Sequence, residues 1–475
     1  MFDYFGLCIN TVITLYDFDY IIENTSISGL VFANTILKGS AARIALVDDQ
    51  IAPGGHWHQL PVFSRIPPPF SSFGLSAYSI QDWRHGLSHT HRDTVLAYCA
   101  HVLEHCLLPS GRVSYFPRCA YHGDGKIVSI DTGQIQNATI RRRVVPPTQP
   151  ARSLSGRHIP CFSYSDPVTV LHPRNVPSNR AFIDRQFDTY CILGAGRMAT
   201  DAALFLLEEK ILPDQIRWVK SRETWALSAP QLAAAPASFK DNASLSLDGL
   251  RLMSQMQTSK ELCLGLERLG LLLRTSSGVE PWGFSQQIIT AAEAARTRTI
   301  RGVIRKGHVH AISEIGMFLD QGVVPMPAKT LYIDCTGSLS ASEKPPQIFQ
   351  DGTIHLADVR LCQPSFSAAI IGAIELLDVS DENKNALCAP VYGSDITTLF
   401  LTSILNYHAW FHHRALRKWL ETCHLDRFLQ TAARKINANV EIQADLKTIR
   451  AVLPRAIINL ERLLEQSGAD DPLIG

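Results

Sequence analysis

Apolar and polar residues follow a regular order near the start of the chain. A short apolar run at residues 19–22 predicts a buried strand, and apolar positions at helical spacing over residues 28–38 predict a helix. A second apolar run at residues 42–47 predicts a parallel strand that ends in two aspartates. Strand, helix and strand together predict a βαβ unit of about 30 residues.

The same order of elements returns later in the chain. The pattern predicts a strand at 190–193, a helix at 199–209 and a returning strand at 215–219. The stretch from 146 to 177 is rich in proline and serine and has few periodic apolar residues, which is typical of a connector. We therefore predict a domain boundary near residue 185.

The composition is that of a globular protein whose partner is a small molecule. Of the 475 residues 46% are hydrophobic, and 45 lysines and arginines balance 44 aspartates and glutamates, so no charge excess favours nucleic acid or an anionic membrane. No apolar run approaches the length of a membrane span, about 18 residues. The first 20 residues carry three aspartates and no basic leader, and the 11 cysteines form no CxxC pair. We expect a cytoplasmic protein with reduced thiols.

Glycine spacing in the second unit predicts a dinucleotide site. Gly194 allows a tight turn, Gly196 lets the backbone approach a pyrophosphate, and Ala199 is small enough for close packing of helix and strand. The helix N-terminus adds partial positive charge for the phosphates. The alternative is a structural relic of such a site.

The end of the next strand indicates which nicotinamide cofactor binds. An acidic residue there would accept the 2′-hydroxyl of NAD, whereas a basic residue accommodates the 2′-phosphate of NADP. The strand runs into Lys220, Ser221 and Arg222. We therefore predict NADPH with Arg222 as the phosphate contact; a plain basic surface is the alternative.

The first unit keeps the frame of this motif but has lost two glycines. Asn24 replaces the turn glycine, Ser26 replaces the close-approach glycine, and Gly29 keeps the packing role. Asparagine tolerates positive φ, so the turn can survive, but Ser26 adds a side chain where a pyrophosphate must come close. Asp48 lies at the strand end for a ribose hydroxyl. Paired dinucleotide units suggest a flavin site that faces a nicotinamide site, and for the first unit retained FAD binding and weakened or lost binding both stay open.

These elements define the predicted fold. The fold class is α/β, with two dinucleotide-binding (Rossmann-like) domains, the NADP domain inserted in the FAD domain, and a helical C-terminal region that covers the core. Strands predicted between residues 302 and 333 return the chain to the first domain. The expected bounds are 1–185 and 326–395 for the FAD domain, 186–325 for the NADP domain and 396–475 for the helical cap.

Residues 18–380 resemble the class B flavin-dependent monooxygenases and their FAD/NAD(P)-binding relatives. The segment Gly54-Gly55-His56-Trp57 is similar to the GGxW motif of that superfamily, and the order of the parts is similar too. After the NADPH unit, a strand ending in Asp334-Cys335-Thr336-Gly337 resembles the superfamily's second nucleotide-contacting turn. The segment from Gln363 to Ser367 opens a helix over 366–377.

The resemblance implies further site residues. Gly54 and Gly55 would let backbone approach the flavin, and Trp57 would pack near its rings; an ordinary turn and a core tryptophan are the alternatives. The helix opened by Gln363 and Ser367 would point at the flavin pyrimidine, and Asp334 and Gly337 would lie beside a cofactor. Arg65 resembles an arginine that could face NADP or the reacting oxygen; it could equally be a surface residue.

Some features argue against more specific readings. The Baeyer-Villiger fingerprint FxGxxxHxxx(F/W) is missing after Phe162, so that specificity is unsupported. His101 with His105, and His408 with His412, are four residues apart but have no obvious third ligand, so we expect no metal.

The resemblance implies an NADPH-dependent flavin monooxygenase that oxygenates a small, lipophilic substrate with O2 through a flavin C4a peroxide, as in secondary metabolism. The residues also allow a flavin-free descendant, a cofactor-independent isomerase or cyclase or a binding protein, that uses the old cleft. A third alternative is that a wrong exon junction produced the first 28 residues, so that the true chain has the normal glycines. Substrate and oligomeric state stay open.

Overall fold

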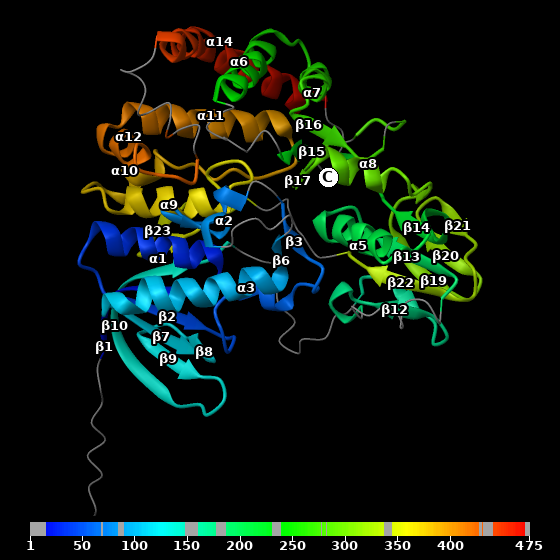
Figure 1. The fold of residues 1–475 in the computed structure, drawn as a ribbon, viewed down its shortest axis with the longest axis horizontal. Helices are drawn as coiled ribbons and strands as arrows, with labels where there is room; N and C mark the ends of the chain where they lie inside the picture. The colour runs from blue at the N-terminus through cyan, green and yellow to red at the C-terminus, as the bar shows by residue number, and fades with distance from the viewer. Residues whose placement is uncertain are drawn as a thin grey trace, which may run out of the picture.

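Two parallel sheets organise the computed structural model (Figure 1). The structure describes residues 16–67, 70–83, 90–147, 160–176, 187–229, 239–276, 278–281, 283–336, 344–426, 430 and 440–470, and only the backbone of 239–246, 286, 440–446 and 467–470.

The first sheet has eight strands, in the order β23-β24-β10-β1-β2-β7, with β9 on β10 and β8 on β9. Its parallel centre is buried on both faces, and Ile21 and Ile22 are 0% exposed. The strands are β1 Tyr16–Glu23, β2 Ile44–Asp48, β7 Val113–Pro117, β8 Cys119–Tyr121, β9 Lys126–Ser129, β10 Ile135–Val145, β23 Phe349–Gln350 and β24 Thr353–His355.

Helices α1 (Ile27–Gly39) and α9 (Pro364–Glu375) pack against each other beside this sheet (Figure 1). The predicted helix at 28–38 is therefore confirmed. Short elements connect β2 to α3 (Arg92–His101), which continues as a π-helical segment, Val102–Leu107. The short elements between β2 and α3 are the 3₁₀ helix Gly55–Gln59, β3 Arg65–Ile66, β4 Gly74–Leu75, β5 Tyr78–Ser79, α2 Ile80–Trp83 and β6 Thr90–His91.

The second sheet has five parallel strands in the order β12-β22-β13-β14-β18. They are β12 Thr169–Leu171, β13 Thr189–Leu193, β14 Ile216–Val219, β18 Gly302–Ile304 and β22 Thr330–Asp334, and α5 (Arg197–Glu208) follows β13. A four-stranded sheet packs next to it: β11 Ser163–Tyr164, β19 Val309–Ser313, β20 Gly316–Leu319 and β21 Gly322–Val324.

Two predicted domain limits differ from this topology. β11 and β12 lie in the stretch that we predicted to be a connector, yet they pair in the sheets of the second unit, so the boundary precedes residue 163. β22 pairs with β12 and β13 and does not return to the first sheet, and β24 is the returning strand. Parallel pairing joins segments far apart in sequence, so the strand pattern alone does not assign a strand to its sheet.

An insertion between β14 and β18 packs with the C-terminal helices. It comprises β15 Thr224–Ser228, α6 Phe239–Gln255, α7 Ser259–Arg268, β16 Leu272–Arg274, β17 Gly283–Ile289 and α8 Ala291–Thr297. The C-terminal helices are α10 Asp381–Asn385, α11 Ile396–His412, α12 Arg414–Leu420 and α14 Val440–Asp470. Leu262, Leu399 and Leu460 lie in one shared core, and α14 lies along α6 (Figure 1).

The α/β fold class and the helical C-terminal region are confirmed. Trp410 of α11 packs on Phe366 of α9, with ring centroids 5.6 Å apart, so these helices also cover the first core. Within the described residues, no helix is long and apolar enough to cross a membrane.

Candidate functional site

The first turn keeps the geometry of a dinucleotide turn without its first two glycines. Asn24 adopts φ 72°, the left-handed conformation that a turn glycine would supply. Ser26 is the N-cap of α1, and its hydroxyl accepts a hydrogen bond from Gly29 N at 3.4 Å. A Cβ at Gly29 would lie 2.7 Å from Asn24 O, so only glycine fits there. Asn24 and Gly29 therefore keep the first and third roles, whereas Ser26 caps the helix at the close-approach position.

The carboxylates after β2 have different roles. Asp48 is 1% exposed and accepts hydrogen bonds from Thr25 N at 2.7 Å and Gln50 N at 2.9 Å, and burial raises its pKa. It therefore fixes the turn and does not face the cavity. Asp49, the next residue, lines the cavity. The structure therefore places Asp49, and not the predicted Asp48, at the cavity, because successive side chains of an extended strand point in opposite directions.

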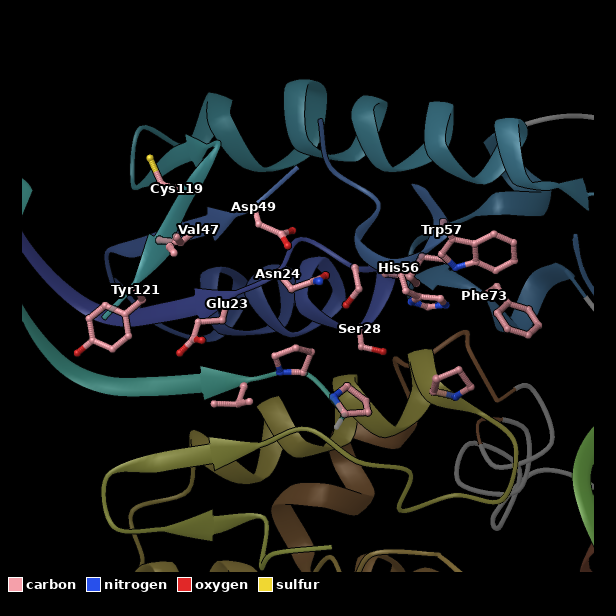
Figure 2. Close-up of a pocket in the computed structure, with 17 residues that line it drawn as sticks. Glu23, Asn24, Ser28, Val47, Asp49, His56, Trp57, Phe73, Cys119 and Tyr121 are labelled. Atoms are coloured by element: carbon pink, nitrogen blue, oxygen red, sulfur yellow. The ribbon is translucent and has the colours of Figure 1, made fainter. Parts of the chain in front are cut away.

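A cavity of about 490 Å³ opens beside this turn. Its size is within the range of small-molecule sites, about 300–1,000 Å³. Figure 2 shows Tyr121 and Cys119 at one end, His56, Trp57 and Phe73 at the other, and Asn24, Ser28 and Asp49 between them. Asn24 and Ser26 line the cavity without filling it. An elongated space with a helix N-terminus at its middle suits a dinucleotide whose diphosphate lies at the centre.

Acidic groups at the cavity are partly neutralised. Glu23 lies just before the turn, where its charge would oppose a diphosphate, but Arg143 of β10 pairs with it. The hydrogen bond to Glu23 raises the pKa of Arg143. Ser26 and Ser28 line the cavity at the start of α1, where hydroxyl and backbone donors can meet phosphate oxygens. The residues present therefore fit an adenine dinucleotide.

The Gly54-Gly55 segment packs directly on this turn. Gly54 adopts φ 136° and donates from its N–H to Thr25 O at 2.9 Å. Gly55 adopts φ 56°, and a Cβ there would lie 2.1 Å from Asn24 Oδ1. His58 Nε2 lies 2.9 Å from Ala52 O and closes the loop. The segment therefore packs tightly against the first turn, and Trp57, which follows it, lines the cavity.

The start of α9 reaches the same cavity. Pro364, its first residue, is part of the cavity lining, as the predicted approach of this helix requires. Gln363 is the N-cap and is 3% exposed. The hydroxyl of Ser367 accepts hydrogen bonds from Val359 N at 3.1 Å and Arg360 N at 3.2 Å, so it holds the preceding loop in place.

Asp358, in that loop, is a residue that the sequence did not single out. No hydrogen bond or ion pair joins its carboxyl to another described residue. Burial raises its pKa to about 7. Asp358 is not among the residues that line the cavity, but a carboxyl that stays protonated near neutral pH can donate a hydrogen bond. What sets Asp358 apart from other aspartates is that its carboxyl has no hydrogen-bond or ion-pair partner among the described residues. This is a property of the folded chain, so the sequence did not reveal it.

We predict that Asp358→Asn stabilises the protein more at pH 8 than at pH 5. The folded pKa is about 7 and the ordinary value 3.8, so as pH rises through this window the unfolded chain ionises first and the native state loses stability. An amide removes that loss, which is at most about 4 kcal/mol at 1.36 kcal/mol per pH unit. Urea unfolding at both pH values measures it. Exposed Asp378→Asn is the control, and an equal effect at both pH values would contradict the assignment.

The second turn has the predicted glycine geometry. Gly194 adopts φ 116°, and a Cβ there would lie 2.8 Å from Cys335 O. A Cβ at Gly196 would have no atom within 4 Å, so the approach to the start of α5 is open. Ala199 is 0% exposed and packs α5 on the sheet. The three positions together have the geometry that a phosphate-binding turn requires, and phosphate binding there stays a prediction.

Asp334 belongs to this second turn and not to the first cavity. It is 1% exposed at the end of β22, next to β13, and accepts a hydrogen bond from Thr336 N at 3.0 Å. Its predicted neighbour Gly337 lies outside the described residues. Asp334 is thus placed beside the NADP-type turn, because β22 pairs in the second sheet.

A polar cluster lies where β14 and β18 end. Lys220 is 4% exposed, and its Nζ lies 2.6 Å from Thr275 Oγ1 and 3.8 Å from the centroid of the Trp218 ring. Glu223 accepts a hydrogen bond from Arg305 at 3.3 Å. Burial lowers the pKa of Lys220 to about 8. The predicted Arg222 is exposed in the same loop.

Arg65 lies away from both cavity and solvent. It is 6% exposed, and its guanidinium donates two hydrogen bonds to Glu208, the last residue of α5. Arg65 is therefore not a surface residue, and a place facing NADP or the reacting oxygen stays a prediction. The rings of His101 and His105 lie tilted to each other, with centroids 4.4 Å apart, and the described residues contain no cluster suited to a metal.

No protein-family model matches the chain. An uncharacterized protein of Mycobacterium tuberculosis is 29% identical over 423 residues, which span 86% of this chain and 77% of the mycobacterial one. A polycyclic ketone monooxygenase from the fungus Thermothelomyces thermophila superposes with a TM-score of 0.51 at 11% identity, covering 97% of this chain and 89% of that one. The chain has the fold of the class B flavin monooxygenases. A flavin monooxygenase from Stenotrophomonas maltophilia has a TM-score of 0.46 at 13% identity, covering 77% of this chain and 100% of that one.

Proposed function

We propose that this protein is an FAD- and NADPH-dependent monooxygenase that acts on a small, lipophilic organic substrate. The observation that carries the proposal is the open cavity beside a turn in which Asn24 supplies the left-handed conformation of the lost turn glycine and Ser26 caps α1. The monooxygenase fold and the intact second turn support it.

The residues at the first site would hold FAD as follows. The start of α1, with Ser26 and Ser28, would bind the diphosphate, and Asp49 would accept hydrogen bonds from the ribose. Trp57 and Pro364 would shield the ring end of the cavity from water. The chemistry that a bound flavin supplies is the acceptance of hydride and the activation of O2.

The residues at the second site would hold NADPH. The turn at Gly194 and Gly196 would receive the pyrophosphate, and Arg222 would pair with the 2′-phosphate, with Lys220 and Arg305 adding positive charge nearby. With both cofactors bound, the chemistry would be theirs, and the residues of the two sites would serve to hold and orient them, so no protein nucleophile would be required.

Arg222→Ala is expected to raise the Michaelis constant for NADPH about tenfold or more and to leave that for NADH within about twofold. A hydrogen bond to a charged group contributes about 1.5–3 kcal/mol. NADPH would lose this contact with Arg222, whereas NADH has no 2′-phosphate and would lose nothing. Steady-state oxidation of both cofactors measures the effect. Exposed Arg268→Ala, on α7, is the control, and equal changes for both cofactors would reject the phosphate contact.

The flavin content of the purified protein tests the proposal against its rival. The rival is a flavin-free protein, and its motivation is that the described lining of the first cavity has two carboxylates and no lysine or arginine. Protein with a flavin absorption band that oxidises NADPH would exclude a flavin-free isomerase or binding protein. Colourless protein that stays inert after addition of FAD would exclude the monooxygenase.

A further inference from the structure

Residues 61–66, which follow the Gly55–Gln59 helix of the first unit, contribute a side chain to the apolar core of the second unit. Phe63 is 4% exposed and stacks on Phe205 of α5, with ring centroids 4.6 Å apart and planes 15° apart. Phe63 shares the apolar core of β13 and α5 with Leu206 and Trp218. Residues 61–66, which we call the strap, therefore connect the cavity wall to the helix of the second turn.

Hydrogen bonds hold the strap to both units. On the first unit, Arg92 at the start of α3 donates from its N–H to Ser64 O at 2.8 Å and from its side chain to Leu60 O at 3.1 Å. On the second unit, Arg65 donates to both oxygens of Glu208, at 3.2 and 2.9 Å. Such a two-bond, planar pair fixes orientation as well as distance.

Glu208 is held from two sides. Arg296, in the last turn of α8, donates to it at 3.1 Å, in addition to Arg65. Although burial opposes the effect, the hydrogen bonds from Arg65 and Arg296 keep the pKa of Glu208 below its ordinary value. The carboxylate is therefore charged at neutral pH, and the end of α5 is tied to the strap by a charged contact and an aromatic stack.

We propose that Arg65 is a positioning residue that sets the geometry between the two nucleotide sites; this inference rests on the proposed function. α5 has 12 residues, so its pyrophosphate-binding start lies about 18 Å from Glu208 at 1.5 Å per residue. A small rotation at Glu208 therefore shifts Gly196 and a nucleotide bound there. A misplacement of about 1 Å between reacting groups can slow a reaction about 100-fold.

The test compares Arg65→Ala, Arg65→Lys and the control Arg251→Ala, which removes an arginine–aspartate pair within α6 alone. Anaerobic stopped-flow measures flavin reduction at saturating NADPH, and equilibrium titration measures the Kd of each cofactor. We expect reduction by Arg65→Ala to be about 10- to 100-fold slower with both Kd values within about twofold, since binding groups are intact. Arg65→Lys keeps the charge but not the two-bond geometry, so its rate falls in between.

Hydrogen–deuterium exchange of residues 61–66 and 197–208 provides a readout that needs no flavin. We expect faster exchange in both segments in Arg65→Ala and no change in Arg251→Ala. Unchanged exchange overturns the inference even if the wild-type chain holds no flavin, so this failure and the failure of the proposed function are distinguishable. In flavin-containing protein, an unchanged reduction rate, or a slower rate explained by a weaker Kd, also overturns it. If Arg65→Ala does not fold, Arg65→Lys decides by the same criteria.

Discussion

Gly55→Ala is expected to weaken FAD binding at least about 100-fold, which corresponds to about 2.7 kcal/mol. The new Cβ would lie 2.1 Å from Asn24 Oδ1 and 2.9 Å from Ser26 Cβ, so the GGxW segment must move away from the turn that it packs against. The left-handed φ of 56° adds strain of about 1–2 kcal/mol. Titration of the flavin-depleted protein with FAD measures the effect.

The matched control is Gly111→Ala. Gly111 has φ 67°, close to that of Gly55, but a Cβ there would meet nothing within 4 Å. It therefore carries the same backbone strain without the contact at the turn. If both variants lose FAD equally, or neither loses it, the Gly54-Gly55 segment does not form the cofactor site.

Gly194→Ala is expected to weaken NADPH binding at least about tenfold and to lower the free energy of unfolding by about 1–3 kcal/mol, the range for a strained backbone. Gly194 adopts φ 116°, and the new Cβ would lie 2.8 Å from the backbone oxygen of Cys335, which cannot move without shifting β22. Trp218 also donates to Gly194 O at 2.8 Å and fixes the turn. Isothermal titration with NADPH and urea unfolding measure the two effects.

FAD binding separates this variant from a general loss of structure. The first cavity shares no lining residue with the Gly194 turn, so FAD affinity is expected to stay within about twofold of wild type. Gly322→Ala, at φ 102° with nothing within 4 Å, is the control for strain alone. Normal NADPH binding by Gly194→Ala would contradict the assignment of the second site.

Local patterns predicted the two βαβ units well because their signals lie within a few residues. Helix α1 and the turn at Gly194 occur where periodicity and glycine spacing placed them. Asp48 and Asp49 show the limit of such reasoning, since a shift of one residue at a strand end exchanges the buried side chain for the exposed one. Composition does not fix that register.

Contacts between distant segments were beyond prediction for a different reason. The pairing of Arg65 with Glu208 joins residues 143 positions apart, and the place of β22 in the second sheet depends on nonlocal pairing. The insertion and α14 likewise share a core that no single segment reveals. Such arrangements follow from packing of whole elements, and the sequence pattern describes each element by itself.

The account depends on a working FAD site at Asn24 and Ser26, and direct titration of the flavin-depleted protein with FAD tests it. We expect saturable binding at one FAD per chain, with a shift of the flavin absorption band, that is lost in Gly55→Ala and kept in Gly111→Ala. Wild-type protein that binds NADPH normally but shows no saturable FAD binding would contradict the account.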